Sequence, residues 1–343
     1  MSANSVATLM AVQLPRAYDV ELLQRDLQTL RDVPRAPQPG PYHKGDWTGI
    51  ALHSMGGRQS VFPSAPGTEH YQVTEELQRT PYFKYVLDDL KCPKEVVRIL
   101  FLPPGVTIGE HFDFHTSFQF GLLRLHIPII TNPHVVFMIG DERMTWREGE
   151  LWYGDFSKVH SVRNDGDTIR VHMVIDVQIN DFVLDLFPPD YIATKRAEGI
   201  SMTNQALPSS EAELRRFVCD FRIPGEFMPM FVIGKPLSTL AKGATAAVRL
   251  IQGRLVVLLD NEPAFSLERI SENTFNISGL PPGIALQFIE HNHVVQDAVL
   301  HLKGLPKDLY SARLGVLRGA SLDERRISLP VVNKIQGAAG ASS

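Results

Sequence analysis

Six short β-type segments follow one another between residues 96 and 179, and this series restricts the fold more than any other feature of the 343-residue chain. They occupy residues 96–102, 122–130, 134–140, 149–155, 159–163 and 168–179. Turn signals such as Pro103-Pro104-Gly105 and Asn164-Asp165-Gly166 separate them. Because no long helical pattern lies between the segments, a parallel βαβ sheet is disfavoured. The pattern predicts a β-barrel or a double-sheet sandwich.

Helical patterns precede this series. Residues 18–32 place leucines at helical spacing with charged residues between them, which is typical of an amphipathic helix. A second helix is expected over 82–90, with Pro81 in its first turn. Between the two, 47–53 is interpreted as a short strand. The stretch 54–70 is rich in Gly, Ser and Pro and is interpreted as a long loop, a candidate lid over a binding site.

The second half of the chain has a different organisation. Residues 181–208 are interpreted as a linking region, and a helix is expected near 209–220, followed by further β-type segments. These features predict a smaller C-terminal α+β domain. We therefore divide the chain into a domain at 1–200, a second domain at 201–336 and a disordered tail at 337–343.

Composition excludes several classes of protein. The formal charge is −4, and no run of Lys or Arg suggests a phosphate-binding stripe, so neither nucleic acid nor an anionic membrane is an expected partner. No apolar stretch is long enough for a transmembrane helix, and the N-terminus lacks the pattern of a signal peptide. The two cysteines, Cys92 and Cys219, cannot form a disulfide framework. A reducing cytoplasm is the expected location.

Three residues in the β-rich region match a metal site. His111 and Asp113 form an H-x-D pair, and residues i and i+2 of an extended segment point to the same face. His160 follows on a different predicted strand. Two histidines and one carboxylate are the facial ligand set of non-haem Fe(II) enzymes, with positions left open for a chelating co-substrate and O2. An isolated H-x-D pair is common, so the hypothesis depends on the whole set.

A hairpin hypothesis links Arg170 to these ligands. If Asn164-Asp165-Gly166 is a three-residue turn with Gly166 in the left-handed region, Arg163 pairs with Asp167. His160 then lies opposite Arg170 and faces the same side of the sheet. A guanidinium beside the metal can bind a carboxylate through two hydrogen bonds, which is what the distal end of 2-oxoglutarate needs. A two-residue loop would turn Arg170 away.

A second basic pair, Arg124 and His126, shares one face of the segment 122–130. Because a buried Arg is rarely tolerated without an anionic partner, Arg124, His126 and Arg170 together predict a cavity for a doubly anionic ligand. Other histidines, His115 and His172 among them, have a simpler interpretation as core or surface residues.

The ordered motifs TPYFKYVLDDL, VRILFLPPGVTIGEHFD, RLHIPIITNP, GELWYGDFSKVHSVRNDG and RVHMVID carry a family resemblance. The stretch from about 81 to 180 resembles the aspartyl/asparaginyl β-hydroxylases, and within them the L-proline cis-4-hydroxylase-like enzymes. The resemblance implies a mainly β fold with a double-stranded β-helix (cupin or jelly-roll) core and N-terminal helices. It implies that His111, Asp113 and His160 bind iron, that Arg170 binds 2-oxoglutarate, and that Arg124 and His126 bind co-substrate or substrate carboxylate.

The implied activity is an Fe(II)- and 2-oxoglutarate-dependent hydroxylation with O2, in which a ferryl species abstracts a hydrogen atom and hydroxyl rebound follows. Asp113 argues against halogenation, because halogenases of this type leave that position free for chloride. The expected substrate is an amino acid or an amino-acid-derived small molecule. An Asp, Asn or Pro residue of a peptide or carrier protein is an alternative, and a non-catalytic cupin-like binding protein is another. Candidate substrate contacts are Trp47, His115, Trp152 and His172, and a homodimer is the assembly considered.

Overall fold

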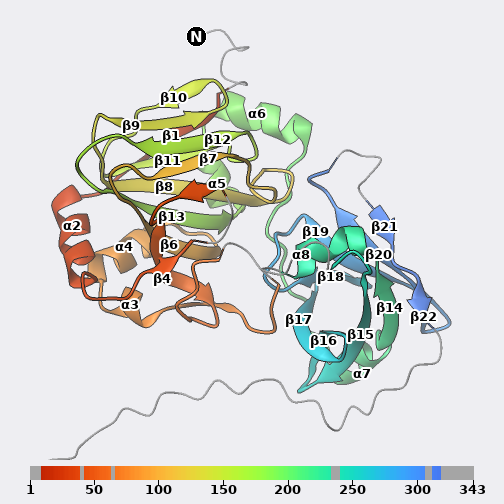
Figure 1. The fold of residues 1–343 in the computed structure, drawn as a ribbon. Coiled ribbons are helices and arrows are strands. Elements are labelled where there is room, and N and C mark those ends of the chain that lie inside the picture. The colour runs from red at the N-terminus through yellow and green to blue at the C-terminus, as the bar shows by residue number, and fades with distance from the viewer. Residues whose placement is uncertain (1–8, 39–41, 63–65, 233–239, 306–310, 318–343) are drawn as a thin grey trace, which may run out of the picture.

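The computed structural model describes residues 9–38, 42–62, 66–232, 240–305 and 311–317. Figure 1 shows two β-rich bodies side by side, one formed by the first half of the chain and one by the second. Within the described residues, no helix is both long and apolar enough to cross a membrane. The predicted tail at 337–343 lies outside this range.

The first body is a sandwich of two antiparallel sheets. The core strands of the larger sheet stand in the order β6 (Lys94–Leu102), β13 (Arg170–Gln178), β8 (Leu122–Ile130) and β11 (Glu150–Gly154). The smaller sheet has the order β7 (Thr107–His111), β12 (His160–Asn164), β9 (Val135–Ile139) and β10 (Glu142–Met144). Additional strands extend the edges, namely β1 (Ala11–Ala17), β2 (Ala36–Pro37), β3 (His43–Lys44), β4 (Thr48–Met55) and β5 (Tyr71–Val73).

This strand order defines the fold. From β6 to β13 the chain passes from one sheet to the other at every connection except the one between β9 and β10. Apart from β10, which pairs only with β9, each of these strands pairs with a strand that is not its neighbour in sequence. The last core strand, β13, lies between β6 and β8, and β12 lies between β7 and β9. That arrangement is a jelly roll. The predicted double-stranded β-helix is therefore confirmed.

The two faces of the larger sheet differ in chemistry because strand side chains alternate between faces. On β13, Val171, Met173 and Ile175 point away from the smaller sheet into the main hydrophobic core. On the same strand, Arg170 and Asp176 point to the inner face, between the two sheets. The main apolar core therefore lies on the outer face of the larger sheet, and the space between the two sheets holds a smaller apolar cluster together with the polar side chains.

Helices cover the outer face of the larger sheet and complete that core. They are α2 (Val20–Thr29), α3 (Glu75–Gln78), α4 (Pro81–Asp89), α5 (Asp181–Asp185) and α6 (Pro189–Glu198). Leu23 and Phe83 are fully buried in it. Asp26 of α2 is also buried, and its Oδ2 accepts hydrogen bonds from the backbone N–H groups of Tyr82 (2.6 Å) and Phe83 (3.0 Å). Asp26 therefore caps α4, whose own Thr80 makes no side-chain cap.

Replacing Asp26 with alanine is expected to lower the free energy of unfolding by about 2–3 kcal/mol, because two buried donors lose a charged acceptor. Urea unfolding measures this change. Asp32→Ala is the matched control, since that carboxylate is 86% exposed and pairs with the neighbouring Arg31 at the surface. A loss for Asp26→Ala no larger than for Asp32→Ala would contradict the capping role.

The second body is one long antiparallel meander. Its strands are β14 (Cys219–Ile223), β15 (Ala244–Ile251), β16 (Arg254–Leu259), β17 (Glu262–Arg269), β18 (Thr274–Ile277), β19 (Ile284–His291), β20 (Val294–Leu302), β21 (Ser311–Arg313) and β22 (Val316–Leu317). β21 pairs with β20 and β22 pairs with β14, so residues 311–317 join the two ends of the sheet. The sheet curls into a barrel, visible in Figure 1, which we call the C-terminal barrel. Phenylalanines and aliphatic side chains fill its interior.

The structure also departs from expectation at specific places. The predicted hairpin between His160 and Arg170 is wrong: β12 and β13 belong to different sheets, Arg170 pairs with Leu102, and Gly166 does not adopt a positive φ. The expected C-terminal helix is confirmed as α7 (Glu211–Arg215), with the short η1 (Gly225–Phe227) and α8 (Met228–Phe231) after it. The C-terminal domain thus has a far smaller helical share than an α+β label suggests.

Candidate active site

The predicted metal ligands come together between the two sheets. One ligand atom each from His111, Asp113 and His160 lies within 4.8 Å of the other two. His111 ends β7 and stands opposite His160 of β12 in the strand register. Asp113 follows two residues later, where its backbone N–H donates to the carbonyl of Phe156 at 2.8 Å. Three groups from two neighbouring strands and one loop thus converge on one point.

Backbone carbonyls orient both imidazole rings. Nδ1 of His111 lies 2.8 Å from the carbonyl oxygen of Gly109, and Nδ1 of His160 lies 3.0 Å from that of Lys158. Because a carbonyl oxygen can only accept, Nδ1 is a protonated nitrogen in each ring, and Nε2 is the nitrogen left for a metal. Burial lowers the pKa of His160 to about 4, against the opposing effect of Asp113, so this ring is neutral at pH 7. Two imidazole nitrogens and a carboxylate fit a divalent transition metal such as Fe(II).

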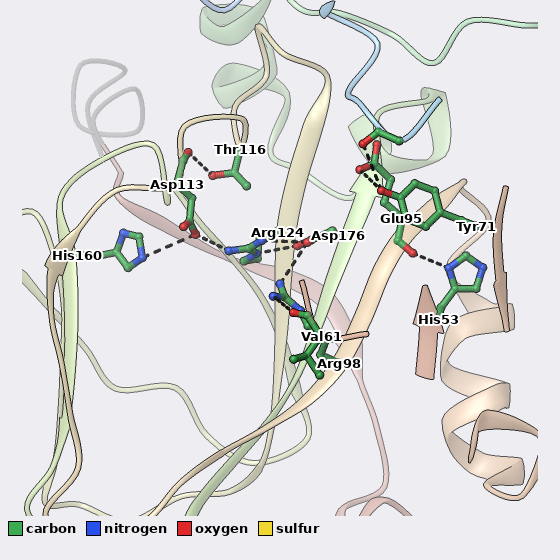
Figure 2. Close-up of polar contacts among 11 residues, drawn as sticks. His53, Val61, Tyr71, Glu95, Arg98, Asp113, Thr116, Arg124, His160 and Asp176 are labelled. Atoms are coloured by element: carbon green, nitrogen blue, oxygen red, sulfur yellow. Dashed lines mark hydrogen bonds and ion pairs between the residues drawn. The ribbon is translucent and has the colours of Figure 1, made fainter. Parts of the chain in front are cut away.

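A line of alternating charges extends from the candidate ligands into the larger sheet (Figure 2). Arg124 donates to Oδ2 of Asp113 through Nη1. It also donates to both oxygens of Asp176, through Nε at 2.7 Å and Nη2 at 2.9 Å. Arg98 approaches the same Asp176 carboxylate from β6 at 3.2 Å and donates to the carbonyl of Val61 at 3.2 Å. Asp176 is fully buried between the two guanidinium groups.

These charges keep Asp113 ionised. Burial would raise the pKa of Asp113, but Arg124 and then the neighbouring histidines outweigh it, so the pKa lies below its ordinary value. Burial would lower the pKa of Arg124, but the two carboxylates of Asp176 and Asp113 outweigh this effect and raise the pKa above its ordinary value. Arg124 thus holds a ready carboxylate ligand in place. The anionic partner that we expected for Arg124 is supplied by the chain itself.

Asp176→Asn is expected to destabilise the protein strongly, because it leaves Arg98 and Arg124 buried with one carboxylate fewer. Breaking a buried pair in this way typically costs about 3–5 kcal/mol. Chemical denaturation measures the effect. Asp88→Asn serves as the control, since its pair with Lys84 is exposed and its loss should leave the midpoint nearly unchanged. Equal midpoints for the two variants would refute the structural importance of this ion network.

Arg170 lies in the same cavity as the candidate ligands. The cavity has a volume of about 390 Å³, and its walls include His111, Asp113, His160 and Arg170. Arg170 is buried and stacks its guanidinium over Phe137 at 5.3 Å. Burial lowers its pKa to about 9, and no carboxylate of the described residues offsets this effect. A buried guanidinium that lines a cavity and has no carboxylate partner among the described residues is a candidate site for an anionic group.

His126 and His172 connect to Arg170. Nη2 of Arg170 donates to Nδ1 of His172 at 3.2 Å, and Nδ1 of His126 lies 3.3 Å from the same atom. Since His172 already accepts from Arg170, His126 is the donor in the second contact. Nε2 of His126 then carries a lone pair, and this atom is buried without a hydrogen-bond partner among the described residues. Burial, reinforced by Arg170, keeps the pKa of both rings well below the ordinary value, so both are neutral. His126 can therefore accept a hydrogen bond from a group in the cavity.

The candidate substrate contacts are placed differently from one another. Trp47 lines the cavity. His115 does not line the cavity; its ring packs against those of Phe114 and Phe120. Nε2 of His115 is buried and has no hydrogen-bond partner among the described residues. Trp152 stacks on Trp146 behind His126, and His172 lines a second cavity of about 810 Å³ that also reaches Arg170. Only Trp47 of these four faces the cavity that holds the candidate ligands.

Sequence reasoning missed several residues of the site. Arg98 and Asp176 are each a charged residue with apolar neighbours in a β-type segment. This is the same signal that points to Arg124, and it could have identified both residues. Tyr42 stacks on His111 with ring centroids 4.6 Å apart, and Phe62 adds an apolar wall. Both come from loops between edge strands, where no periodic pattern points to a cavity.

Comparisons with known proteins agree with this architecture. Residues 18–179 match the family described as Aspartyl/Asparaginyl beta-hydroxylase. L-proline cis-3-hydroxylase 1 of Streptomyces sp. is 26% identical over 168 residues, which are 46% of this chain and 57% of that protein. The present chain therefore spans little more than half the length of that relative.

Two solved structures share a weak overall similarity. A 2OG-Fe(II) oxygenase-family oxidoreductase from Burkholderia pseudomallei has 15% identity and a TM-score of 0.36, covering 51% of this chain and 88% of its own. A Pseudomonas putida prolyl-4-hydroxylase has 12% identity and a TM-score of 0.35, covering 52% of this chain and 97% of its own.

The fold and the site define a jelly-roll protein with a two-histidine, one-carboxylate centre inside its sandwich. Residues 18–179, slightly less than half of the chain, match the model of the aspartyl/asparaginyl β-hydroxylase family. The resemblance predicted from the motifs is confirmed at this level. The named relative is a proline cis-3-hydroxylase, whereas the motifs suggested the cis-4 enzymes.

Proposed function

We propose that this protein is an Fe(II)- and 2-oxoglutarate-dependent hydroxylase. The observation that carries the proposal is Arg170, a buried cation without a carboxylate partner among the described residues, in one cavity with His111, Asp113 and His160. A metal centre alone does not require such a cation. A dicarboxylate that chelates the metal at one end and needs a cation at the other explains both features.

Each group of the chain has a separate task in this proposal. His111, Asp113 and His160 hold the iron, and Arg124 holds Asp113 ionised and in position. Arg170 binds the distal carboxylate of 2-oxoglutarate, and His126 accepts a hydrogen bond inside the cavity. When bound, iron with 2-oxoglutarate and O2 would supply the oxidising chemistry for hydroxylation of an unactivated C–H bond. The protein orients the target and keeps bulk water away.

For the substrate we propose an amino acid or an amino-acid-derived small molecule. The cavity volume of about 390 Å³ lies near the lower end of the roughly 300–1,000 Å³ typical of small-molecule sites. Its apolar walls include Trp47, Phe62 and Leu100, which suit the carbon skeleton of a compact substrate. The name of the Streptomyces relative, an L-proline hydroxylase, supports the same size class.

The experiment that tests the function is an aerobic incubation with Fe(II), 2-oxoglutarate and a panel of free amino acids. Formation of succinate, together with a product heavier by one oxygen atom, is the expected result. If only peptides or carrier-bound residues of Asp, Asn or Pro gained oxygen, the substrate class would change and the reaction type would remain. If no succinate formed either with or without an amino acid, while 2-oxoglutarate still bound, the protein would be a non-catalytic binding protein and the enzyme hypothesis would be rejected.

Location and assembly remain expectations that go with this proposal. Both cysteines are free thiols, and burial raises the pKa of Cys92 to about 11 and that of Cys219 to about 12, so neither is a reactive thiolate at pH 7. We keep the cytoplasm as the proposed setting and a homodimer as the assembly to test by light scattering.

A further inference from the structure

The C-terminal barrel contacts two loops that also reach the cavity. The first loop connects β4 to β5, and its described residues are 56–62 and 66–70. The second follows β7 and covers 112–121, beginning beside the candidate ligand His111. One of these loops carries Asp113 and the other carries Phe62, and both residues line the cavity. The barrel thus touches two separate segments that contribute to the lining of the cavity.

The first loop is bound along its backbone by β17 and β18 and the turn that follows. The backbone N–H of Gly67 donates to the carbonyl of Ser278, and that of Ser266 donates to the carbonyl of Gly67, both at 3.0 Å. The hydroxyl groups of the two serines donate to the carbonyls of Thr68 (3.2 Å) and Glu69 (3.0 Å). This is a ladder of hydrogen bonds between the two bodies, and it turns the predicted lid into an anchored segment.

The other limb of this loop faces the candidate active site. Gln59 binds both backbone groups of Ala51 on β4, at 2.9 and 2.8 Å. The carbonyl of Val61 accepts from Arg98, the outer member of the charge line that ends at Asp113. Phe62 lines the cavity. Of the described residues on either side of 63–65, those at 66–70 thus contact the C-terminal barrel and those at 59–62 contact the wall of the cavity.

The second loop is anchored by one side chain. Phe120 is 2% exposed and belongs to the hydrophobic interior of the C-terminal barrel, not to that of the jelly roll. Its carbonyl accepts from the backbone N–H of Gly283 at 2.8 Å. Gly304 lies so close to the ring that an added Cβ would collide with it. Absence of a side chain at 304 is what makes room for the anchor.

Between this anchor and Asp113 the loop is short and tightly bonded. The Thr116 N–H and hydroxyl both donate to the carbonyl of Asp113, at 3.2 and 3.0 Å. The N–H of Phe120 bonds the Ser117 hydroxyl at 3.2 Å. The ring of Phe114 rests on that of Phe120 with centroids 5.4 Å apart. Local hydrogen bonds and a ring contact thus connect Asp113 to Phe120 along the eight residues 113–120.

We propose that the C-terminal barrel positions the metal pocket, with Phe120 as the positioning residue for Asp113 and with Ser266 and Ser278 holding the loop that carries Phe62. The proposal rests on the proposed function only in regarding the pocket as an active site. It gives the C-terminal domain a role, because without the barrel both loops would lose their outer supports. A domain that does not contact the metal can thus fix the position of the loops that carry residues of the metal pocket.

Hydrogen–deuterium exchange and Co(II) titration of the full chain test this inference with two variants. Phe120→Ala should speed exchange in 112–119 and weaken Co(II) binding about tenfold, since loss of support for a ligand typically costs 10–100-fold in affinity. Phe120→Leu, which keeps an apolar anchor, should restore most of that affinity. Ser266→Ala with Ser278→Ala should speed exchange about tenfold in 66–70 and raise it in 56–62, with Co(II) affinity unchanged.

Val294→Ala is the matched control, because that side chain is 58% exposed on β20. It should change neither readout. The inference is overturned if exchange in both loops stays at the wild-type rate, or if Phe120→Ala speeds exchange equally in β8 and β13, which would indicate general destabilisation. The readouts need no turnover, so a protein that failed to make succinate would refute the proposed function and leave this test intact.

Discussion

His160→Ala is expected to abolish iron-dependent turnover and to remove stoichiometric metal binding. The variant deletes one of the three proposed ligands, and among the described residues no other His, Cys, Asp or Glu joins this group. Loss of an outer-shell partner already costs about 10–100-fold in metal affinity or activity, and loss of a ligand should exceed that. Metal analysis after dialysis and the rate of succinate formation measure the two effects.

The control for this variant is His134→Ala, which removes a histidine of the exposed turn before β9. It should leave metal content and turnover unchanged. The His160→Ala protein should also remain folded, because the ring makes one hydrogen bond to a backbone carbonyl and its other contacts are with Phe156 and with the two proposed ligands His111 and Asp113. Full metal retention by folded His160→Ala would contradict the ligand assignment.

Arg170→Met is expected to weaken 2-oxoglutarate binding by about 2–5 kcal/mol, the usual result of removing one partner of a buried, hydrogen-bonded charge pair. This corresponds to roughly 30- to 5,000-fold in affinity. Arg170→Lys should be intermediate, because it keeps the charge and loses the two-pronged geometry. Fluorescence or calorimetric titration with 2-oxoglutarate in the presence of Fe(II), without O2, gives the dissociation constants.

Although Arg170→Met should weaken 2-oxoglutarate binding, it is not expected to lower the stability of the ligand-free protein. In the ligand-free protein, Arg170 is a buried cation without a carboxylate partner among the described residues. Its replacement by methionine, an apolar side chain of similar length, should therefore leave the ligand-free protein as stable or more stable. Thermal unfolding with and without 2-oxoglutarate measures both effects. A large loss of stability with unchanged 2-oxoglutarate affinity would assign Arg170 a structural role instead.

The strand positions were well predicted because their pattern is strong. The six β-type segments appear as β6, β8, β9, β11, β12 and β13, each within two residues at either end. The strand β7 was missed because Thr107–His111 contains Gly109 and Glu110, which weaken its β pattern. β1 was missed because Pro15 interrupts it, and Pro is tolerated there because β1 lies at the edge of the sheet.

The error over Arg170 illustrates what local reasoning cannot supply. Two neighbouring strands joined by a short turn usually form a hairpin, yet here the turn carries the chain from one sheet to the other. Arg170 nevertheless faces the cavity, because each strand turns an inner face towards it. The residue was thus identified through an incorrect register. Only the order of strands within the sheets, a non-local property, fixes its position.

The partner of Arg124 was equally beyond local reasoning. The sequence showed a charged residue in an apolar strand, which predicts an anion nearby but not its source. The structure supplies Asp176, which pairs with Arg124 across β8 and β13. Nor could the pattern show that Phe120 belongs to the interior of the C-terminal barrel. Both facts depend on which segments, distant in sequence, meet in the folded chain.

The central claim is that one cavity binds Fe(II) through His111, Asp113 and His160 and binds 2-oxoglutarate through Arg170. An anaerobic titration of the protein with Fe(II) and 2-oxoglutarate, followed by visible absorption, tests it most directly. The account predicts the charge-transfer band of an Fe(II)–2-oxoglutarate chelate, saturating at one equivalent of iron. The band should be absent in His160→Ala and should require far more 2-oxoglutarate in Arg170→Met. Absence of the band in the wild-type protein, or its full persistence in His160→Ala, would contradict the account.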